Sequence, residues 1–268
     1  MSEDPPKVVL TIAGFDPSSG AGMTADLKTI AAHHLYGVAC ITALTVQSTQ
    51  GVRRVQPLDP KLVRETLDTL IADVRPAAVK IGMFGSGEVA AEVADFLTSA
   101  SLRNVVLDPV LRSSSGASLL DVAGFSALRS RLLGRVDVIT PNLEEAGPLA
   151  DIDARDLDSA RAAARKLVEL GVKAAVVTGG HLPEFTDVLA ERKPEGKIEL
   201  EEFPGENVET ANTHGTGCAF STALACNLAI GLTLREAVRG AKAYVTQSLK
   251  NSYPVGKGIS PINHLFGT

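Results

Sequence analysis

Short runs of apolar, often β-branched residues alternate with longer amphipathic stretches over the first part of the chain. The runs predict strands at 7–13, 39–45, 78–81, 104–107, 136–140 and 174–178. The stretches between them predict helices at 21–34, 60–73, 87–100, 123–133 and 157–170. Most of the runs are largely apolar, as expected of strands covered on both faces. The alternation therefore predicts an α/β fold, a layered α/β/α sandwich around a mostly parallel central sheet.

The pattern changes after residue 178. Two strands are predicted at 187–192 and 197–203, joined by a Pro-Glu-Gly turn into an antiparallel hairpin on the sheet edge. Two helices follow at 215–230 and 234–249. Because no repeat, low-complexity tract or composition break divides the sequence, we expect residues 1–268 to form a single domain.

The charge balance argues against a nucleic-acid partner. A net charge of -5 with 21% charged residues provides no basic field for a polyanion. The three cysteines, Cys40, Cys218 and Cys226, lack the spacing of a zinc site or a disulfide framework, which favours a reducing cytoplasm. The first seven residues also lack the basic-then-apolar layout of a signal peptide.

Residues 215–234 contain no charged side chain and are numerous enough to cross a bilayer as a helix. The stretch nevertheless lacks aromatic anchors at its ends and contains glycines together with the polar residues Thr216, Ser221, Thr222, Asn227 and Thr233. We therefore expect a buried helix of a soluble protein and no membrane partner.

The segment immediately ahead of this helix is the most informative one. Residues 212–218 read Asn-Thr-His-Gly-Thr-Gly-Cys. Gly215, Thr216 and Gly217 at a helix N-terminus can turn unpaired backbone N–H groups toward an anion, reinforced by the helix dipole. The same field is expected to lower the thiol pKa of Cys218, making it a candidate proton acceptor. The alternative is a glycine-rich capping turn followed by an inert cysteine.

A second candidate site is the pair Asn142 and Glu145, which follows a predicted strand and begins a helix. Residues three apart share a helix face, and their oxygens suit Mg2+, which takes few protein ligands beside phosphates. A capping box, with Asn142 as N-cap and Glu145 as its partner, is the commoner explanation of such a pair taken alone and requires no function.

Small residues follow the first predicted strand at 12–22, where a ligand can approach the backbone at the carboxyl end of a sheet. Gly14, Gly20 and Gly22 miss the dinucleotide-binding spacing, which weakens a hydride-transfer reading. Gln47 follows the second predicted strand and can donate and accept simultaneously, as the edge of an aminopyrimidine requires.

Taken in order, these segments resemble the hydroxymethylpyrimidine/phosphomethylpyrimidine kinase family. The resemblance runs from the first strand to the Pro261-x-Asn263-His264 tail. It rests on the motifs at 13–17, 20–22, 25–28, 47–49, 80–83, 108–110, 140–143, 179–181 and 213–218.

The resemblance implies a ribokinase-like fold, ATP and Mg2+ as cofactors, a role in thiamine biosynthesis and a homodimer. It implies that the Gly-Thr-Gly turn is an anion hole with Cys218 as base and that Asn142 and Glu145 are associated with Mg2+. It places Asp108, Thr178 and Lys242 toward the nucleotide. Residues that it implies hold the pyrimidine are Gly14, Ala21, Asp26, Gln47, Met83 and Val110.

Several positions depart from the family pattern. Phe15 stands where Ser or Thr is common, Thr178 stands in place of a common Lys, and 112–115 lacks the usual Lys before its Ser-Gly. Two other functions therefore remain open: a pyridoxal or pyridoxine kinase, which shares the fold, and a ligand-binding regulator that has lost transfer activity.

Overall fold

The apolar runs of the sequence assemble into one sheet. The structure, a computed structural model, describes residues 5–113, 116–180 and 182–267. Within these residues nine strands pair in the order β3-β2-β1-β4-β5-β6-β7-β8-β9. The strands are β1 Val8–Phe15, β2 Tyr36–Ser48, β3 Gly51–Pro57, β4 Ala78–Ile81, β5 Val105–Leu107, β6 Val138–Ile139, β7 Ala174–Val177, β8 Asp187–Arg192 and β9 Ile198–Phe203.

The middle of the sheet is parallel and its edges are antiparallel. β1 pairs in parallel with β2 on one side and with β4 on the other, and the parallel pairing continues through β5, β6 and β7. β3 pairs antiparallel with β2, and β8 and β9 extend the opposite edge as a hairpin. The predicted mostly parallel sheet with an edge hairpin is thus confirmed.

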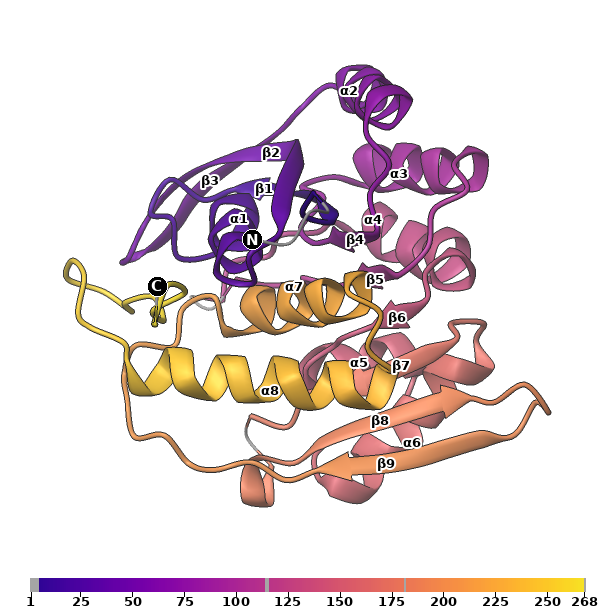
Figure 1. Cartoon of the computed structure of the whole chain (residues 1–268), viewed down its shortest axis with the longest axis vertical. Helices are drawn as coiled ribbons and strands as arrows, with labels where there is room; N and C mark the ends of the chain where they lie inside the picture. The colour runs from indigo at the N-terminus through magenta and orange to yellow at the C-terminus, as the bar shows by residue number, and fades with distance from the viewer. Residues whose placement is uncertain (1–4, 114–115, 181, 268) are drawn as a thin grey trace.

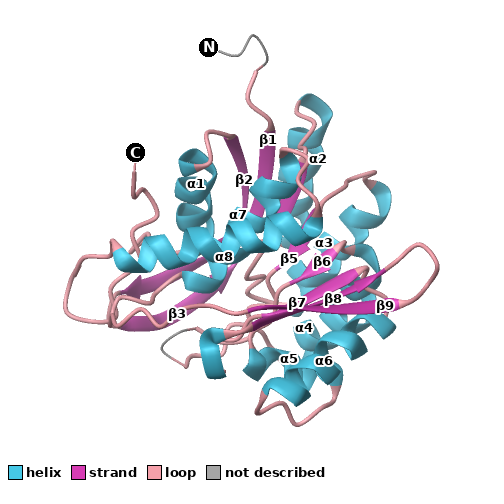
Figure 2. Cartoon of the chain, turned by 60° about the horizontal axis from the view of Figure 1, so that its bottom comes forward, coloured by secondary structure: helices cyan, strands magenta, loops and turns pink. Residues whose placement is uncertain are grey.

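Helices cover both faces of the sheet, which gives three layers (Figures 1 and 2). On one face lie α1 Gly22–Ala32, α7 Thr216–Ala229 and α8 Leu234–Lys250. On the other lie α2 Pro60–Asp73, α3 Gly87–Ser99, α4 Val122–Ala127, α5 Leu143–Ala150 and α6 Leu157–Glu169.

Alternate side chains of the strands feed the two cores. In β1, Leu10 and Ile12 pack under α2 and α3, whereas Val9 packs with Phe220 and Leu224 of α7. This alternation is the period of two expected of an extended chain whose faces are both buried. The uncharged stretch predicted as a buried helix is α7, and no helix among the described residues is apolar and long enough to span a membrane.

Two elements differ from the sequence prediction. β3 was not predicted, because Arg53 and Arg54 interrupt the apolar alternation that marks a strand. Val46 of β2 pairs with Arg54 and Gln47 pairs with Val52, so Arg53 is an extra residue on β3. The helix predicted at 123–133 is α-helical only to Ala127, and continues as a π-turn and a short 3-10 turn to Arg135.

The strand order places a crevice where ligands bind in sheets of this kind. The chain runs from β1 to β2 on one side and returns to β4 on the other side of β1. Loops diverge at such a switch point and leave room outside the carboxyl ends of the strands.

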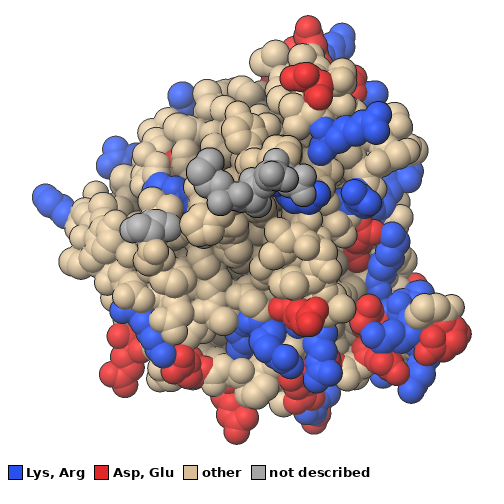
Figure 3. Space-filling view, viewed as in Figure 1, with Lys and Arg blue, Asp and Glu red and all other residues tan. Residues whose placement is uncertain are grey.

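The surface along the edge formed by β8 and β9 carries basic and acidic side chains side by side (Figure 3). Lys193, Lys197 and Arg235 pair with glutamates there.

Candidate active site

The predicted anion cradle lies at the start of α7. Gly215 is the residue before the helix and has a φ of +88°, a conformation that favours glycine. A Cβ at this position would lie 1.8 Å from the carbonyl oxygen of Gly20, so the loop after β1 touches the cradle directly. Nothing lies within 4 Å of the corresponding position at Gly217. Because first-turn amides have no intrahelical partner, those of Gly217 and Cys218 can serve an anion in this open space.

The thiol of Cys218 is half-buried beside this space, and its pKa is raised rather than lowered. Burial raises the pKa of Cys218 to about 12; the charge of Lys80 lowers it, and the charges of Asp108 and Asp26 raise it further. The prediction of a lowered thiol pKa is wrong, because burial and two carboxylates outweigh the field of the helix. At neutral pH Cys218 is therefore a thiol in the resting protein.

Beneath Cys218 a fully buried ion pair joins β4 to α1. Lys80 Nζ lies 2.9 Å and 3.0 Å from the two carboxylate oxygens of Asp26. The hydroxyl groups of Thr11 and Thr222 also donate to Asp26, at 2.6 Å and 2.8 Å. Burial lowers the pKa of Lys80, but the charges of Asp26 and Asp108 and the hydrogen bonds to Asp26 outweigh it and raise that pKa overall. Since its oxygens are occupied, Asp26 lies in the core under the site, and its contact with substrate stays a prediction.

Lys80 lies within the motif at 80–83, but the sequence alone indicates no role for it. The available signal was a lone charged residue inside an otherwise apolar strand, since a lysine is almost never fully buried unless it is paired.

Asp108, which follows β5, and Glu145, in the first turn of α5, are both buried acidic residues. Ser221 of α7 donates to Asp108 at 3.1 Å. Burial raises the pKa of Glu145 to about 8, and the charge of Asp108 contributes. Burial likewise raises the pKa of Asp108, although Lys80 opposes it. Two buried carboxyl groups that disfavour each other's charge form a donor set of the kind that a hard cation stabilises.

Asn142 and Glu145 form the capping box that the sequence left open as an alternative. Asn142 Oδ1 accepts from the backbone N–H of Glu145 at 2.9 Å, and Glu145 Oε2 accepts from that of Asn142 at 3.0 Å. Glu145 Oε1 also accepts from Leu111 N at 3.3 Å. No group of three or more His, Cys, Asp or Glu within the described ranges is arranged to hold a metal ion. The assignment of Asn142 and Glu145 to Mg2+ therefore stays a prediction.

The predicted pyrimidine residues gather at the ends of β1, β2 and β4. A Cβ on Gly14 would lie 3.1 Å from the sulfur of Met83, and Val110 packs against the small cluster to which Met83 belongs. Ala21 donates its backbone N–H to Asp16 at 3.0 Å. Gln47 lies 3.4 Å from His214 of the cradle loop.

Asp16 and His214 connect the pyrimidine side to the cradle. His214 Nε2 lies 2.9 Å from Asp16 Oδ2, and both side chains are buried. Burial alone would raise the pKa of Asp16, but hydrogen bonds from His214 and Ser18 outweigh it and hold that pKa below its usual value. Sequence reasoning quoted both residues within motifs and gave neither a role; their pairing across 198 residues carries no local signal.

Two of the residues assigned to the nucleotide, Thr178 and Lys242, lie on the β7 side, whereas the third, Asp108, follows β5. Lys242 of α8 pairs with Asp187 at 2.8 Å and donates to the carbonyl of Phe185 at 2.6 Å. Thr178 follows β7 and forms an isolated bridge with Asn142. Of the other motif residues, Ser114, Ser115 and His181 lie outside the described residues.

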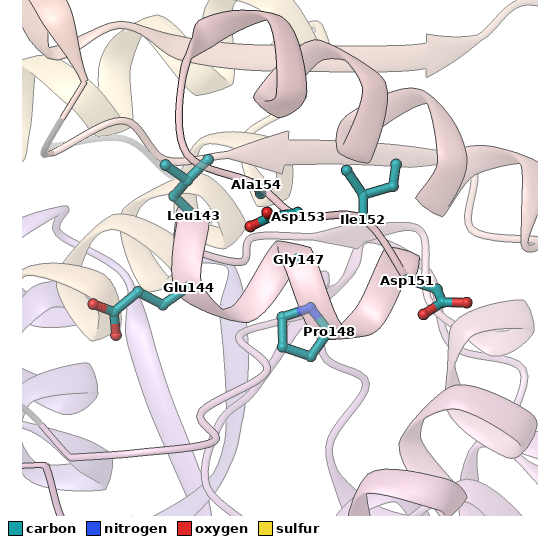
Figure 4. Close-up of a pocket in the computed structure, with 8 residues that line it drawn as sticks. All are labelled: Leu143, Glu144, Gly147, Pro148, Asp151, Ile152, Asp153 and Ala154. Carbon is teal, nitrogen blue, oxygen red and sulfur yellow. The ribbon is translucent and has the colours of Figure 1, made fainter.

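Two hollows open near these loops. One lies on the outer side of α5, lined by Leu143, Glu144, Pro148 and Asp151 among others, and the close-up shows Glu144 and Asp151 pointing away from each other (Figure 4). It contains no residue of the predicted site. The other is small and enclosed, and is lined by Gln47, Ser48, Thr49, Gly51, Ser113, His214 and Ile259. This second hollow lies between Gln47 and His214 of the cradle loop.

An anion cradle and buried carboxylates at the switch point of a ribokinase-like fold define a small-molecule phosphotransferase. The family model for phosphomethylpyrimidine kinase matches residues 16–263. The chain belongs to the phosphomethylpyrimidine kinase family.

Similar proteins agree with this assignment. The chain is 42% identical over 260 residues to the hydroxymethylpyrimidine/phosphomethylpyrimidine kinase of Salmonella typhimurium, covering 95% of this chain and 96% of that protein. It is 39% identical over 259 residues to the thiamine biosynthesis bifunctional protein ThiED of Geobacter sulfurreducens, covering 96% of this chain but only 52% of that longer protein. A structure of Bacillus subtilis pyridoxal kinase in complex with ADP superposes with a TM-score of 0.87 at 34% identity, covering 97% of each chain.

Proposed function

We propose that this kinase transfers the γ-phosphoryl group of ATP to the hydroxymethyl group of 4-amino-5-hydroxymethyl-2-methylpyrimidine and then to the resulting monophosphate, in thiamine biosynthesis. The observation that carries the proposal is the contact between the loop before α7, which forms the cradle, and the loops after β1 and at the end of β2. Gly215 lies against the loop after β1, and His214 beside it reaches Gln47, so an alcohol held at Gln47 lies close to the amides at the start of α7.

In this proposal the cradle stabilises the migrating charge. Backbone amides of Gly217 and Cys218 face the phosphoryl group, and the helix dipole reinforces them. Because phosphoryl transfer passes through a loose transition state, positioning and charge stabilisation supply most of the catalysis. Cys218 can take the alcohol proton only as a thiolate, after its own proton has passed to solvent, and the charge of Lys80 favours the thiolate.

The heterocycle would lie among Gly14, Ala21, Gln47, Met83 and Val110. Its hydroxymethyl group would then point toward α7. Asp26 acts from below, by fixing Lys80 under Cys218.

ATP would lie on the other side of the cradle. Asp108, Thr178 and Lys242 would line its position, and the ADP complex of the Bacillus subtilis kinase supports nucleotide use by this fold. Glu145, with Asp108 and the oxygen of Asn142, would hold Mg2+, because the two buried carboxyl groups, whose pKa values are raised, suit a hard cation. When bound, Mg2+ neutralises phosphate charge.

One assay tests the proposal: purified protein with Mg-ATP and the pyrimidine alcohol, scoring ADP and product mass. We expect ADP release and two successive products, each heavier by one phosphate. A single product would restrict the enzyme to the first step. No ADP above the no-substrate control would contradict the proposal and favour a ligand-binding regulator.

The second candidate is a pyridoxal kinase, which the likeness to the Bacillus subtilis enzyme favours. Pyridoxal also carries a hydroxymethyl group on a nitrogen heteroaromatic ring. The same assay with pyridoxal in place of the pyrimidine decides between them, because the preferred alcohol gives the larger kcat/KM.

We also propose that the protein is a cytoplasmic homodimer. Cys40, Cys218 and Cys226 are free of disulfides, which fits a reducing compartment. Exposed apolar side chains on β2 offer a surface for a second copy.

A further inference from the structure

Residues 260–264, the C-terminal segment, fold back from the end of α8 and lie beside the start of α7 (Figure 1). His214 and Pro261 form an isolated parallel bridge. The backbone N–H of His214 donates to the carbonyl oxygen of Ser260 at 3.1 Å, and its carbonyl oxygen accepts from the N–H of Ile262 at 3.2 Å. Both backbone groups of His214, the residue before the N-cap of α7, are therefore bonded to the C-terminal segment.

The C-terminal segment is itself fixed to α8. Ser260, Ile262 and His264 are each no more than 3% exposed, which is the period of two expected of an extended chain with one buried side. The hydroxyl group of Tyr244 in α8 donates to the carbonyl oxygen of His264 at 2.7 Å, and the rings of Tyr244 and Phe266 lie 5.4 Å apart. The segment therefore holds the loop before α7 in place relative to α8.

The loop after β1 contacts the same two residues of the cradle. A Cβ on Gly20 would lie 2.3 Å from His214 Cδ2 and 3.1 Å from Pro261 Cβ. A Cβ on Gly215 would lie 1.8 Å from the carbonyl oxygen of Gly20 and 3.5 Å from His264 Nε2. The backbone of His214 and Gly215 is therefore in close contact with both the loop after β1 and the C-terminal segment, and has little room to shift.

The ring of His264 contributes packing at this point and no charge. Burial and the charges of Lys28 and His214 lower the pKa of His264 to about 4, so its ring is neutral at pH 7. Among the described residues, His264 Nε2 has no hydrogen-bond partner. An apolar side chain of similar size can therefore replace the ring without breaking a hydrogen bond at that atom, whereas a smaller one leaves a space beside Gly215.

We propose that Tyr244 and His264 are positioning residues of the active site: they fix the C-terminal segment, which holds the loop before α7 so that the amides of Gly217 and Cys218 face the phosphoryl group. Amides stabilise a developing charge best when they are already oriented before the reaction, because no free energy is then spent on turning them. This inference rests on the proposed function, since it assigns the cradle to a phosphoryl group.

The kinetics of four variants test the positioning role. Tyr244→Phe keeps the ring but removes the hydroxyl group that holds His264, and His264→Ala leaves a space beside Gly215. We expect each to lower kcat about tenfold and to change the KM of the pyrimidine alcohol less than about twofold, because the residues predicted to hold the heterocycle lie on other loops. His264→Leu refills the space and should recover most of kcat. Tyr253→Phe, a change at an exposed tyrosine, should have normal kinetics.

Amide hydrogen exchange without substrates, followed by NMR, separates this inference from the proposed function. The N–H of His214 is bonded to Ser260, so Tyr244→Phe and His264→Ala should make it exchange about fivefold faster, while the amides of β8 keep their rates. An unchanged His214 rate in both variants would overturn the inference, and so would faster exchange with a normal kcat.

A wild type that transfers no phosphate would contradict the proposed function alone. The Kd of the ATP analogue AMP-PCP, measured by calorimetry, then decides the inference. Binding about fivefold weaker in Tyr244→Phe and His264→Ala than in the wild type and Tyr253→Phe supports the positioning role. Equal Kd values in all four proteins, or no binding by the wild type, overturn it.

Discussion

At Cys218 the competition between helix field and burial has a measurable result. A thiol with a pKa of about 12 is almost wholly protonated at pH 7, and only thiolate reacts with iodoacetamide. We expect alkylation of Cys218 to be far slower than that of a free cysteine, and to rise about tenfold per pH unit between pH 7 and 10.

Mass spectrometry of the adduct measures this rate, and Cys218→Ala identifies which adduct belongs to the residue. Cys40 should also resist alkylation, because burial raises the pKa of its thiol to about 12. Fast alkylation of Cys218 at pH 7 with a flat pH profile would show that the helix field wins after all.

The second prediction concerns the stability that depends on the ion pair of Lys80 and Asp26. Asp26→Asn leaves the ammonium group of Lys80 buried without its countercharge, and we expect a loss of about 3–5 kcal/mol in unfolding free energy. Asp153→Asn is the control, because Asp153 and its partner Arg155 are both exposed, and it should cost less than about 1 kcal/mol. Urea unfolding measures both, and equal stability of the two variants would contradict the role of the buried pair.

Some residues of the candidate site could be predicted from the sequence and others could not. Gly215 to Cys218 could be placed from local pattern, because a glycine-rich turn before a helix has a local cause. The pairing of Lys80 with Asp26 joins residues 54 positions apart, and the thiol pKa depends on that pair. Such contacts exist only after the chain has folded, so no local motif contains them.

At the scale of elements, two glycines at the start of α7, Gly215 and Gly217, differ in how much space a side chain would have. Gly215→Ala would force a Cβ to within 1.8 Å of a carbonyl oxygen in a left-handed backbone, so we expect a loss of at least about 2 kcal/mol in unfolding free energy. Gly217→Ala meets nothing within 4 Å, so its unfolding free energy should change by no more than about 1 kcal/mol. Its methyl group instead enters the open space assigned to the phosphoryl group, so turnover should fall.

Thermal unfolding and kcat distinguish the two effects. A Gly217→Ala enzyme with normal turnover would show that the phosphoryl group does not use this space, and a stable Gly215→Ala would show that the two loops can separate.

Element boundaries were predictable where one periodicity ran unbroken. The predicted strand at 187–192 coincides with β8, and the predicted helix at 60–73 coincides with α2. β3 was missed because it is an edge strand with adjacent arginines, whose polar side chains serve solvent and not a core.

For the whole molecule, alternation of strands and helices was enough to predict the layers but not the strand order. Local pattern does not say that β4 returns beside β1, because that choice depends on which faces remain to be buried. The crevice, and with it the meeting of Gln47 with the cradle, follows from this order. The strand order was indicated by the resemblance to the kinase family, which implies a ribokinase-like fold, and not by the periodicity of the sequence. The described strands form one continuous sheet, which fits a single domain over 1–268. The single domain stays a prediction.

The outer face of β2 gives the last prediction, the proposed homodimer. Leu44 and Val46 lie two residues apart and therefore on one face of the strand, and they are 43% and 47% exposed. Neighbouring exposed apolar side chains beside an edge strand are better covered than left in water. We expect light scattering to give the mass of two chains, and the double change Leu44→Glu and Val46→Glu to give one. Ile230→Glu, a change at an exposed apolar residue that follows α7, should leave the dimer intact. A monomeric wild type would contradict the homodimer, whereas a double variant that stays dimeric would place the interface away from this hairpin.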